Sequence, residues 1–203
     1  MKYSASFTAG SLLLNEFNSL IKLILTTDLR KEKDTIIKEN ILKINSESSR
    51  RRVLSEIIKR VEAVDNSVWR FYTDCNENEK RALLFYVILK SHPLVFDFQR
   101  EIILENFRTY NLIISKADIE MFLMKKSSSH PEIDSWSPST LSKIIHTTIL
   151  ILQQSNILKD YTITPLTLTN IFWVKFIKVG DPWFLELALL NKEQRKIIHE
   201  LNT

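Results

Sequence analysis

The chain has 203 residues, 44% apolar and 26% charged, enough to bury a core as one large domain or two small ones. A formal net charge of +4 gives a modest bias towards anionic partners. Two glycines and one cysteine exclude a glycine-rich phosphate loop, an internal disulfide and a cysteine-based zinc site. Few glycines also mean few tight hairpins, so helices joined by polar turns are expected.

Apolar residues recur at helical spacing through the first half of the chain. Asn76 is a good helix N-cap, and Pro93 can occupy the first position of the helix that follows. The most apolar block, ALLFYVIL at 82–89, is too short to span a membrane, so we expect a buried core helix. The single cysteine favours a cytosolic protein. The predicted helices of this half cover residues 11–24, 33–44, 48–64, 77–91 and 94–109.

The second half begins with a capping-box pattern at Ser115 and Asp118. The polar stretch SSSHPEIDSWS at 127–137 then breaks the helical pattern and predicts a domain boundary. We therefore expect an all-α protein with an N-terminal helical bundle over 1–130 and a smaller C-terminal helical subdomain over 131–203. One compact unit is the alternative. The predicted elements after the boundary are a helix over 138–156, a short extended piece over 160–164 and helices near 167–178, 182–190 and 192–202.

Sequence motifs of catalysis are missing. The two glycines cannot form a P-loop, a dinucleotide-binding motif or a nucleophile elbow. The four histidines are scattered; His92 precedes a proline and is typical of a turn, and Cys75 has no neighbouring base. We therefore expect no catalytic residue, no metal and no cofactor. The remaining alternative is an enzyme whose site is assembled from residues distant in sequence.

The basic stretch NSESSRRRVLSEIIKR at 45–60 is the first candidate binding site. If Ser48 or Ser49 caps a helix, Arg50, Arg51 and Arg52 crowd its first turn, where cations oppose the helix dipole. A bound phosphate would reverse that cost, with the serine hydroxyls as further donors. Lys59 and Arg60 extend the positive charge along the helix. The alternative is a solvated face with ion pairs to Glu56, and a helix starting at Ile41 would remove the dipole argument.

The helix predicted over 138–156 is the second candidate. A helix after a turn, followed by a short strand, is typical of a winged helix-turn-helix, whose recognition helix contacts DNA. The alternative is an ordinary amphipathic core helix. The residues expected to point outward are Ser139, Thr140, Lys143 and Thr147.

Three stretches in order, YSASFTAGSLLLNEF, NILKINSESSRRRVLSEIIKRV and WSPSTLSKIIHTTILILQQSNIL, resemble the BrxA family of bacteriophage-exclusion (BREX) defence systems. The resemblance implies an all-helical fold with a part similar to the transcription antitermination protein NusB. It also implies DNA binding and a place in a multi-gene anti-phage system.

The predicted function is a non-enzymatic accessory protein of a BREX system that binds double-stranded DNA through its phosphates. Other BREX proteins are expected partners, and no membrane is. The alternative is an assembly adapter that docks on another protein of the system and binds little or no DNA. The predicted DNA contacts are Arg50, Arg51, Arg52, Lys59, Arg60, Ser48, Ser49 and, from the C-terminal part, Lys143.

Overall fold

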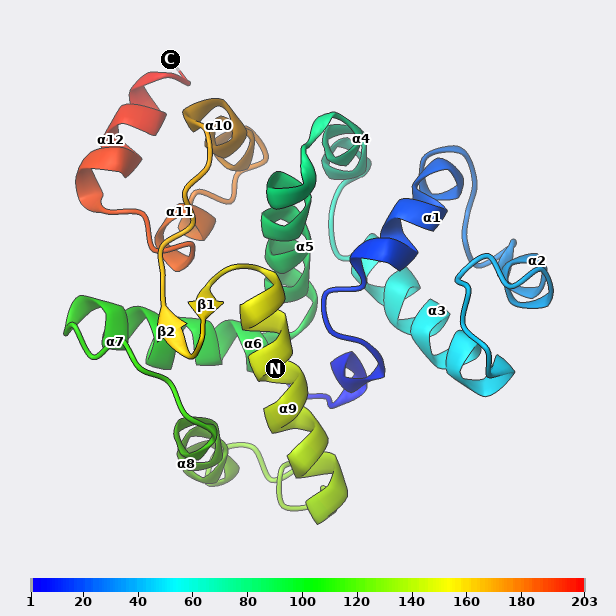
Figure 1. Ribbon diagram of the computed structural model, residues 1–203, viewed down its shortest axis with the longest axis horizontal. Coiled ribbons are helices and arrows are strands. Elements are labelled where there is room, and N and C mark those ends of the chain that lie inside the picture. Colours follow the sequence, from blue (N-terminus) through cyan, green and yellow to red (C-terminus); the bar gives the residue numbers. More distant parts are fainter. Residues whose placement is uncertain (1, 203) are drawn as a thin grey trace.

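The computed structural model describes residues 2–202 and is predominantly helical, as predicted (Figure 1). Helix α5 lies at the centre, and every residue of its Ala82–Leu89 segment is buried. A helix that is apolar all round requires such a position. The first half consists of a 3-10 turn, η1 (Ser6–Ala9), and helices α1 (Leu14–Thr26), α2 (Lys33–Lys38), α3 (Glu47–Glu62), α4 (Asn66–Asp74) and α5 (Glu77–Ser91).

The second half starts with a long helix in three consecutive pieces and ends with three short helices. Of these, α10 and α11 lie beside α5, and α12 packs against α10 (Figure 1). Its elements are α6 (Pro93–Phe98), a π-helical piece η2 (Gln99–Ile103), α7 (Leu104–Arg108), α8 (Lys116–Ser127), α9 (Pro138–Gln154), β1 (Leu158–Lys159), β2 (Thr162–Ile163), α10 (Asn170–Lys178), α11 (Trp183–Leu187) and α12 (Lys192–Glu200). None of the helices within residues 2–202 has the length and apolar character needed to cross a lipid bilayer.

Side-chain caps set several helix starts where the sequence predicted them. Asn76 and Ser115 both form complete capping boxes, and Ser137 caps α9 with Pro138 in the first turn. The helix predicted over 33–44 is shorter than expected: it ends at Lys38, and Asn40 then adopts a left-handed conformation with φ 50°. Helix α4 was not predicted.

A single continuous core of buried apolar side chains extends from Tyr3 to Ile198. Tyr86 of α5 packs against the rings of Phe176 and Phe184 at centroid distances of 4.9 and 5.3 Å, which joins α5 to α10 and α11. Hydrogen bonds also cross the predicted boundary; Gln99 Nε2 donates to the Leu187 carbonyl at 2.6 Å. The division at residue 130 remains a prediction.

Candidate nucleic-acid interface

The segment from α6 to β2 has the chain order of a winged helix. The helix formed by α6, η2 and α7 is followed by an extended segment, then by α8, α9 and the antiparallel hairpin of β1 and β2. Ile113 in the extended segment forms a bridge with Thr162 of β2, so the strand before α8 pairs with the last strand. Backbone bonds from Ile163 to Leu112 (2.7 Å) and from Ile114 to Tyr161 (2.9 Å) hold this pairing.

The turn between α8 and α9 departs from a short helix-turn-helix connection. It covers residues 128–137, whereas helix-turn-helix turns usually have about three or four residues. The hairpin turn is tight: Asp160 and Tyr161 both have positive φ, 48° and 65°. That geometry belongs to type I′ turns, which suit the right-handed twist of a two-stranded hairpin.

The exposed face of α9 carries small polar groups and one lysine: Ser139, Ser142, Lys143 and His146. Thr140 is half-buried, and its hydroxyl lies 3.0 Å from Ser137 Oγ at the helix cap. The outward position predicted for Thr147 is wrong, because its side chain is only 7% exposed and faces the core. Lys143 therefore lies exposed on α9, the second of the two helices before the hairpin, with no ion pair or hydrogen bond of its ammonium within residues 2–202.

The start of α3 differs from both predicted caps. Ser46 is the N-cap, and its hydroxyl accepts from the Ser49 backbone N–H at 3.4 Å. Glu47 occupies the first turn, so the arginines begin one turn later, and the predicted crowding of cations at the helix end is wrong. The predicted contact residue Ser48 is exposed, with its hydroxyl 2.8 Å from that of Ser46.

Two of the three arginines have local partners. The Arg50 guanidinium donates to the carbonyls of Ile44 (2.8 Å) and Asn45 (3.2 Å), which fixes the loop before α3. Arg51 pairs with Glu47 at 2.8 Å on the surface. Arg52 is exposed and has no ion pair or hydrogen bond within residues 2–202. Arg52 is therefore the most available of the three for a phosphate.

Arg60 lies in the interior, with 0% of its surface exposed. Its guanidinium pairs with Glu56 at 2.7 Å and donates to the carbonyls of Ser11 (2.6 Å) and Gly10 (2.8 Å). The prediction that Arg60 contacts DNA is wrong, because burial leaves no room for a phosphate. The helical period that puts Arg60 four residues after Glu56 also puts both on the core face of α3.

The buried His92 and the half-buried Lys59 complete a polar cluster around Glu56. His92 Nε2 lies 2.5 Å from Glu56 Oε1, and Lys59 Nζ lies 3.3 Å from His92 Nδ1 and donates to Ser6 Oγ at 3.0 Å. This arrangement suits a neutral imidazole that donates from Nε2 and accepts at Nδ1. Sequence reasoning treated His92 as a turn residue; its apolar neighbours at 82–89 and 94–95 were the available signal of its burial.

Burial and mutual contacts lower the pKa values of three members of this cluster, Glu56, His92 and Lys59. Burial by itself raises the pKa of the Glu56 carboxyl, but the His92 hydrogen bond and the charge of Arg60 outweigh burial and lower that pKa to about 2. Burial lowers the pKa of His92 despite the opposing effect of Glu56, and burial also lowers the pKa of Lys59. Glu56 is therefore charged and His92 is neutral near pH 7.

A hollow of about 330 Å³ lies between η1 and α3, next to this cluster. The η1 turn contributes Ser6 and Thr8 to its lining, and α3 contributes two cations, one hydroxyl and one carboxylate: Arg52, Lys59, Ser55 and Glu56. Cationic groups and hydroxyls are the donors that phosphate oxygens accept from. The η1 turn contacts both α3 and α9, so it lies between the two helices (Figure 1). The contribution of η1 was not predicted, because its contact with α3 joins segments about fifty residues apart.

Acidic, histidine and cysteine side chains do not gather in threes that could hold a metal ion anywhere in residues 2–202. Cys75 is buried, and burial raises the pKa of its thiol to about 12, so the unreactive thiol form predominates at neutral pH.

These features define a helical protein with a winged-helix chain order beside a basic hollow. The family model of BrxA matches residues 1–176, and the chain belongs to the BrxA family. It is 27% identical over 128 residues to the BREX protein BrxA of Bacillus cereus (strain H3081.97), covering 63% of this chain and 64% of that protein. It is 26% identical over 136 residues to the BREX protein BrxA of Escherichia coli O9:H4 (strain HS), covering 66% of this chain and 64% of that protein. The chain thus spans just under two thirds of these relatives.

The fold is also found in a solved structure, that of an uncharacterized protein from Magnetospirillum magneticum. The TM-score is 0.76 at 18% identity, covering 93% of this chain and 98% of that chain. At this identity the likeness concerns the fold. The predicted similarity of one part to NusB remains a prediction.

Proposed function

We propose that this protein is a non-enzymatic accessory component of a BREX anti-phage system and that it binds double-stranded DNA. The winged-helix chain order, with Ile113 paired to Thr162 and α9 in the recognition-helix position, carries the DNA part of the proposal. The name of the two curated relatives supports the part about the system.

In the proposed complex, α9 lies along the duplex and Lys143 contacts a phosphate. Ser139, Ser142 and His146 lie on the same exposed face and can donate to phosphates or base edges. The charge of +4 for the whole chain favours association without giving sequence preference.

The hollow beside η1 supplies a second phosphate contact through Arg52. Lys59 adds positive charge there, although its ammonium also holds Ser6 and His92. Arg50 and Arg51 act mainly through their contacts with the loop before α3 and with Glu47, and contribute at longer range. Their role with DNA is therefore smaller than that of Arg52.

The test is fluorescence anisotropy of the full chain on a short labelled duplex across a salt series. Each phosphate contact contributes about 0.9 to the slope of log K against log salt. We expect Arg52→Ala and Lys143→Ala each to make that slope shallower by about one unit, and the double variant by about two. Lys192→Ala, an exposed lysine on α12 without an ion pair in residues 2–202, is the matched control and should leave the slope unchanged.

Two results would overturn the proposal. A folded wild-type chain that does not bind duplex DNA at low salt rules out DNA as its ligand. Equal slopes for the wild type, both single variants and the Lys192→Ala control place the DNA contact away from α9 and the hollow.

A further inference from the structure

An apolar groove runs between α8, the turn after it and the start of α9. It has a volume of about 380 Å³ and is lined by Leu123, Met124, Ile133, Trp136, Leu141 and Ile145. Met124 in this lining is 74% exposed, and Met121, three residues earlier on α8 and outside the lining, is 56% exposed. Exposed apolar side chains clustered at a groove are typical of interaction sites.

The charges at this groove are both negative. Glu120 and Asp134 line it, both are exposed, and neither has an ion pair or hydrogen bond within residues 2–202. Two unpaired carboxylates beside an apolar floor repel DNA phosphates and attract cationic side chains. A second hollow shares Glu120 with this groove and is also lined by Lys116 and His146. Asp134 and Trp136 line the first groove only, so the carboxylate of Asp134 lies away from these basic groups and that of Glu120 lies beside them.

We propose that this groove docks a basic amphipathic helix from a partner protein. The apolar side of such a helix fits the floor of the groove, as helix-in-groove complexes do with anchors at helical spacing. Its lysines or arginines pair with Glu120 and Asp134. The unbranched side chains of Met121 and Met124 can adapt to the shape of the anchors, and Trp136 offers a large contact surface.

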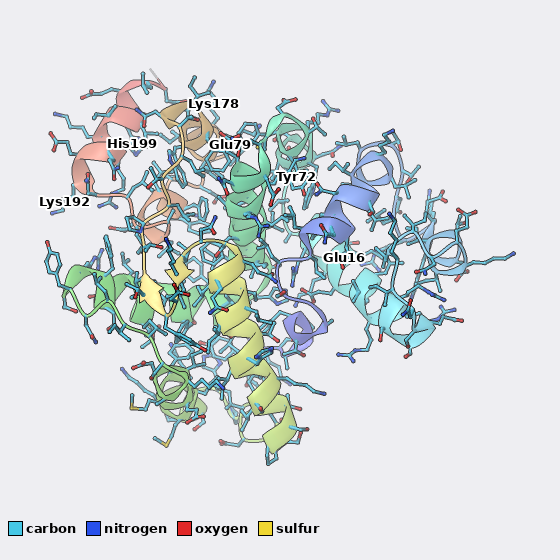
Figure 2. All side chains as sticks on the ribbon, in the orientation of Figure 1. Glu16, Tyr72, Glu79, Lys178, Lys192 and His199 are labelled. Atoms are coloured by element: carbon cyan, nitrogen blue, oxygen red, sulfur yellow. The ribbon has the colours of Figure 1, made fainter. Side chains whose placement is uncertain are left out.

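A second apolar groove has basic and not acidic side chains in its lining, so it can be compared with the first within the same protein. It lies between α4, α10 and the end of α12, and its apolar lining is Phe71, Ile171, Val174 and Leu201. Its charged lining groups are Lys175 and Lys178. Figure 2 labels Lys178, at the end of α10. Ile171 there is 81% exposed. Non-specific binding through exposed apolar side chains would occur at both grooves. Binding of a basic helix is expected only at the groove that Glu120 and Asp134 line.

The test uses two labelled 18-residue peptides on the full chain, read by fluorescence anisotropy. Both have leucine at the same helical positions; the polar positions are lysine in one and glutamate in the other. We expect the lysine peptide to bind at least tenfold more tightly. We expect each of two double variants to bind the lysine peptide at least tenfold more weakly than the wild type. These are Met121→Ser/Met124→Ser and Glu120→Gln/Asp134→Asn. The matched controls Ile171→Ser and Glu39→Gln/Glu193→Gln remove equivalent exposed groups elsewhere and should leave its affinity unchanged.

The outcomes separate this proposal from other occupants of the groove and from DNA binding. Equal affinity for the two peptides, or an equal loss in the control variants, overturns it. Self-association of the wild type that Met121→Ser/Met124→Ser abolishes assigns the groove to a second copy of the chain instead. Duplex binding that Met121→Ser/Met124→Ser weakens and Arg52→Ala/Lys143→Ala leaves unchanged assigns the groove to DNA.

Discussion

Arg60 and Glu56 form an ion pair of 2.7 Å in which both side chains are 1% exposed. The two buried charges compensate each other. The remaining guanidinium donors of Arg60 bind the Gly10 and Ser11 carbonyls, so Arg60 also attaches the N-terminal segment to α3. One Glu56 oxygen, Oε1, accepts from both Arg60 and His92, while Oε2 has no partner within residues 2–202. The most basic stretch of the sequence thus ends in a structural residue.

Replacing Arg60 should strongly destabilise the protein. Arg60→Ala leaves the Glu56 carboxylate without its buried counter-ion, a change that costs roughly 3–5 kcal/mol in comparable cases. Arg51→Ala removes an exposed pair and should cost about 1 kcal/mol or less. Urea denaturation followed by circular dichroism measures both free energies of unfolding. Equal stabilities of the two variants would show that the buried pair is not needed.

The free energy of unfolding should decrease in two steps as the pH is lowered. The folded-state pKa of His92 is lowered, so the unfolded chain takes up this proton first, and the free energy of unfolding decreases as pH falls below about 6.5. The Glu56 pKa is also lowered, to about 2, so its contribution is complete above about pH 5 and is lost as pH falls towards 2.

Denaturation curves between pH 7.5 and 3 test this order. His92→Gln should remove the decrease between about pH 6.5 and 5.5 and retain the decrease at lower pH. His146→Gln, at an exposed histidine, is the control and should follow the wild type. A His92→Gln variant with the wild-type slope above pH 5.5 would contradict the assignment.

Tyr3 should hold the N-terminal segment against the C-terminal half. Its hydroxyl donates to Asp97 at 2.6 Å, its ring stacks on His130 with centroids 3.8 Å apart, and its backbone N–H donates to Glu132. Tyr3→Phe removes one hydrogen bond to a charged group and should cost about 1.5–3 kcal/mol. Tyr3→Ala also creates a cavity and should cost about 3–5 kcal/mol. Thermal and urea unfolding give both values, and a Tyr3→Phe variant as stable as the wild type would show that the hydroxyl contributes nothing.

A fragment of residues 131–203 should not fold alone. It retains α9 and the hairpin but loses α8 and the Ile113 strand that pairs with Thr162. The apolar side of α9, with Ile144 and Ile149, would then be exposed to water. Circular dichroism and amide NMR dispersion of the fragment test this. A cooperatively folded fragment would instead support the domain boundary predicted at residue 130.

The sequence by itself determined the helical class and many helix ends. These depend on neighbours within a few residues: Asn76 with Glu79, Ser115 with Asp118, and Ser137 before Pro138 all act within one turn. Helix α4 had a similar signal, since Asp65 caps it and Val68, Trp69 and Tyr72 lie at helical spacing. These local signals were sufficient to predict α4 from the sequence.

The tertiary structure alone decided which charged residues of α3 are accessible. Arg52 and Arg60 are chemically identical and only eight residues apart, yet one is exposed and the other is fully buried. The difference comes from η1, the N-terminal loop and His92, which are distant in sequence and cover one side of α3. Pairing of Ile113 with Thr162 likewise joins residues far apart in the chain. Local patterns fix local conformation, whereas burial and strand pairing depend on long-range contacts that one stretch of sequence does not specify.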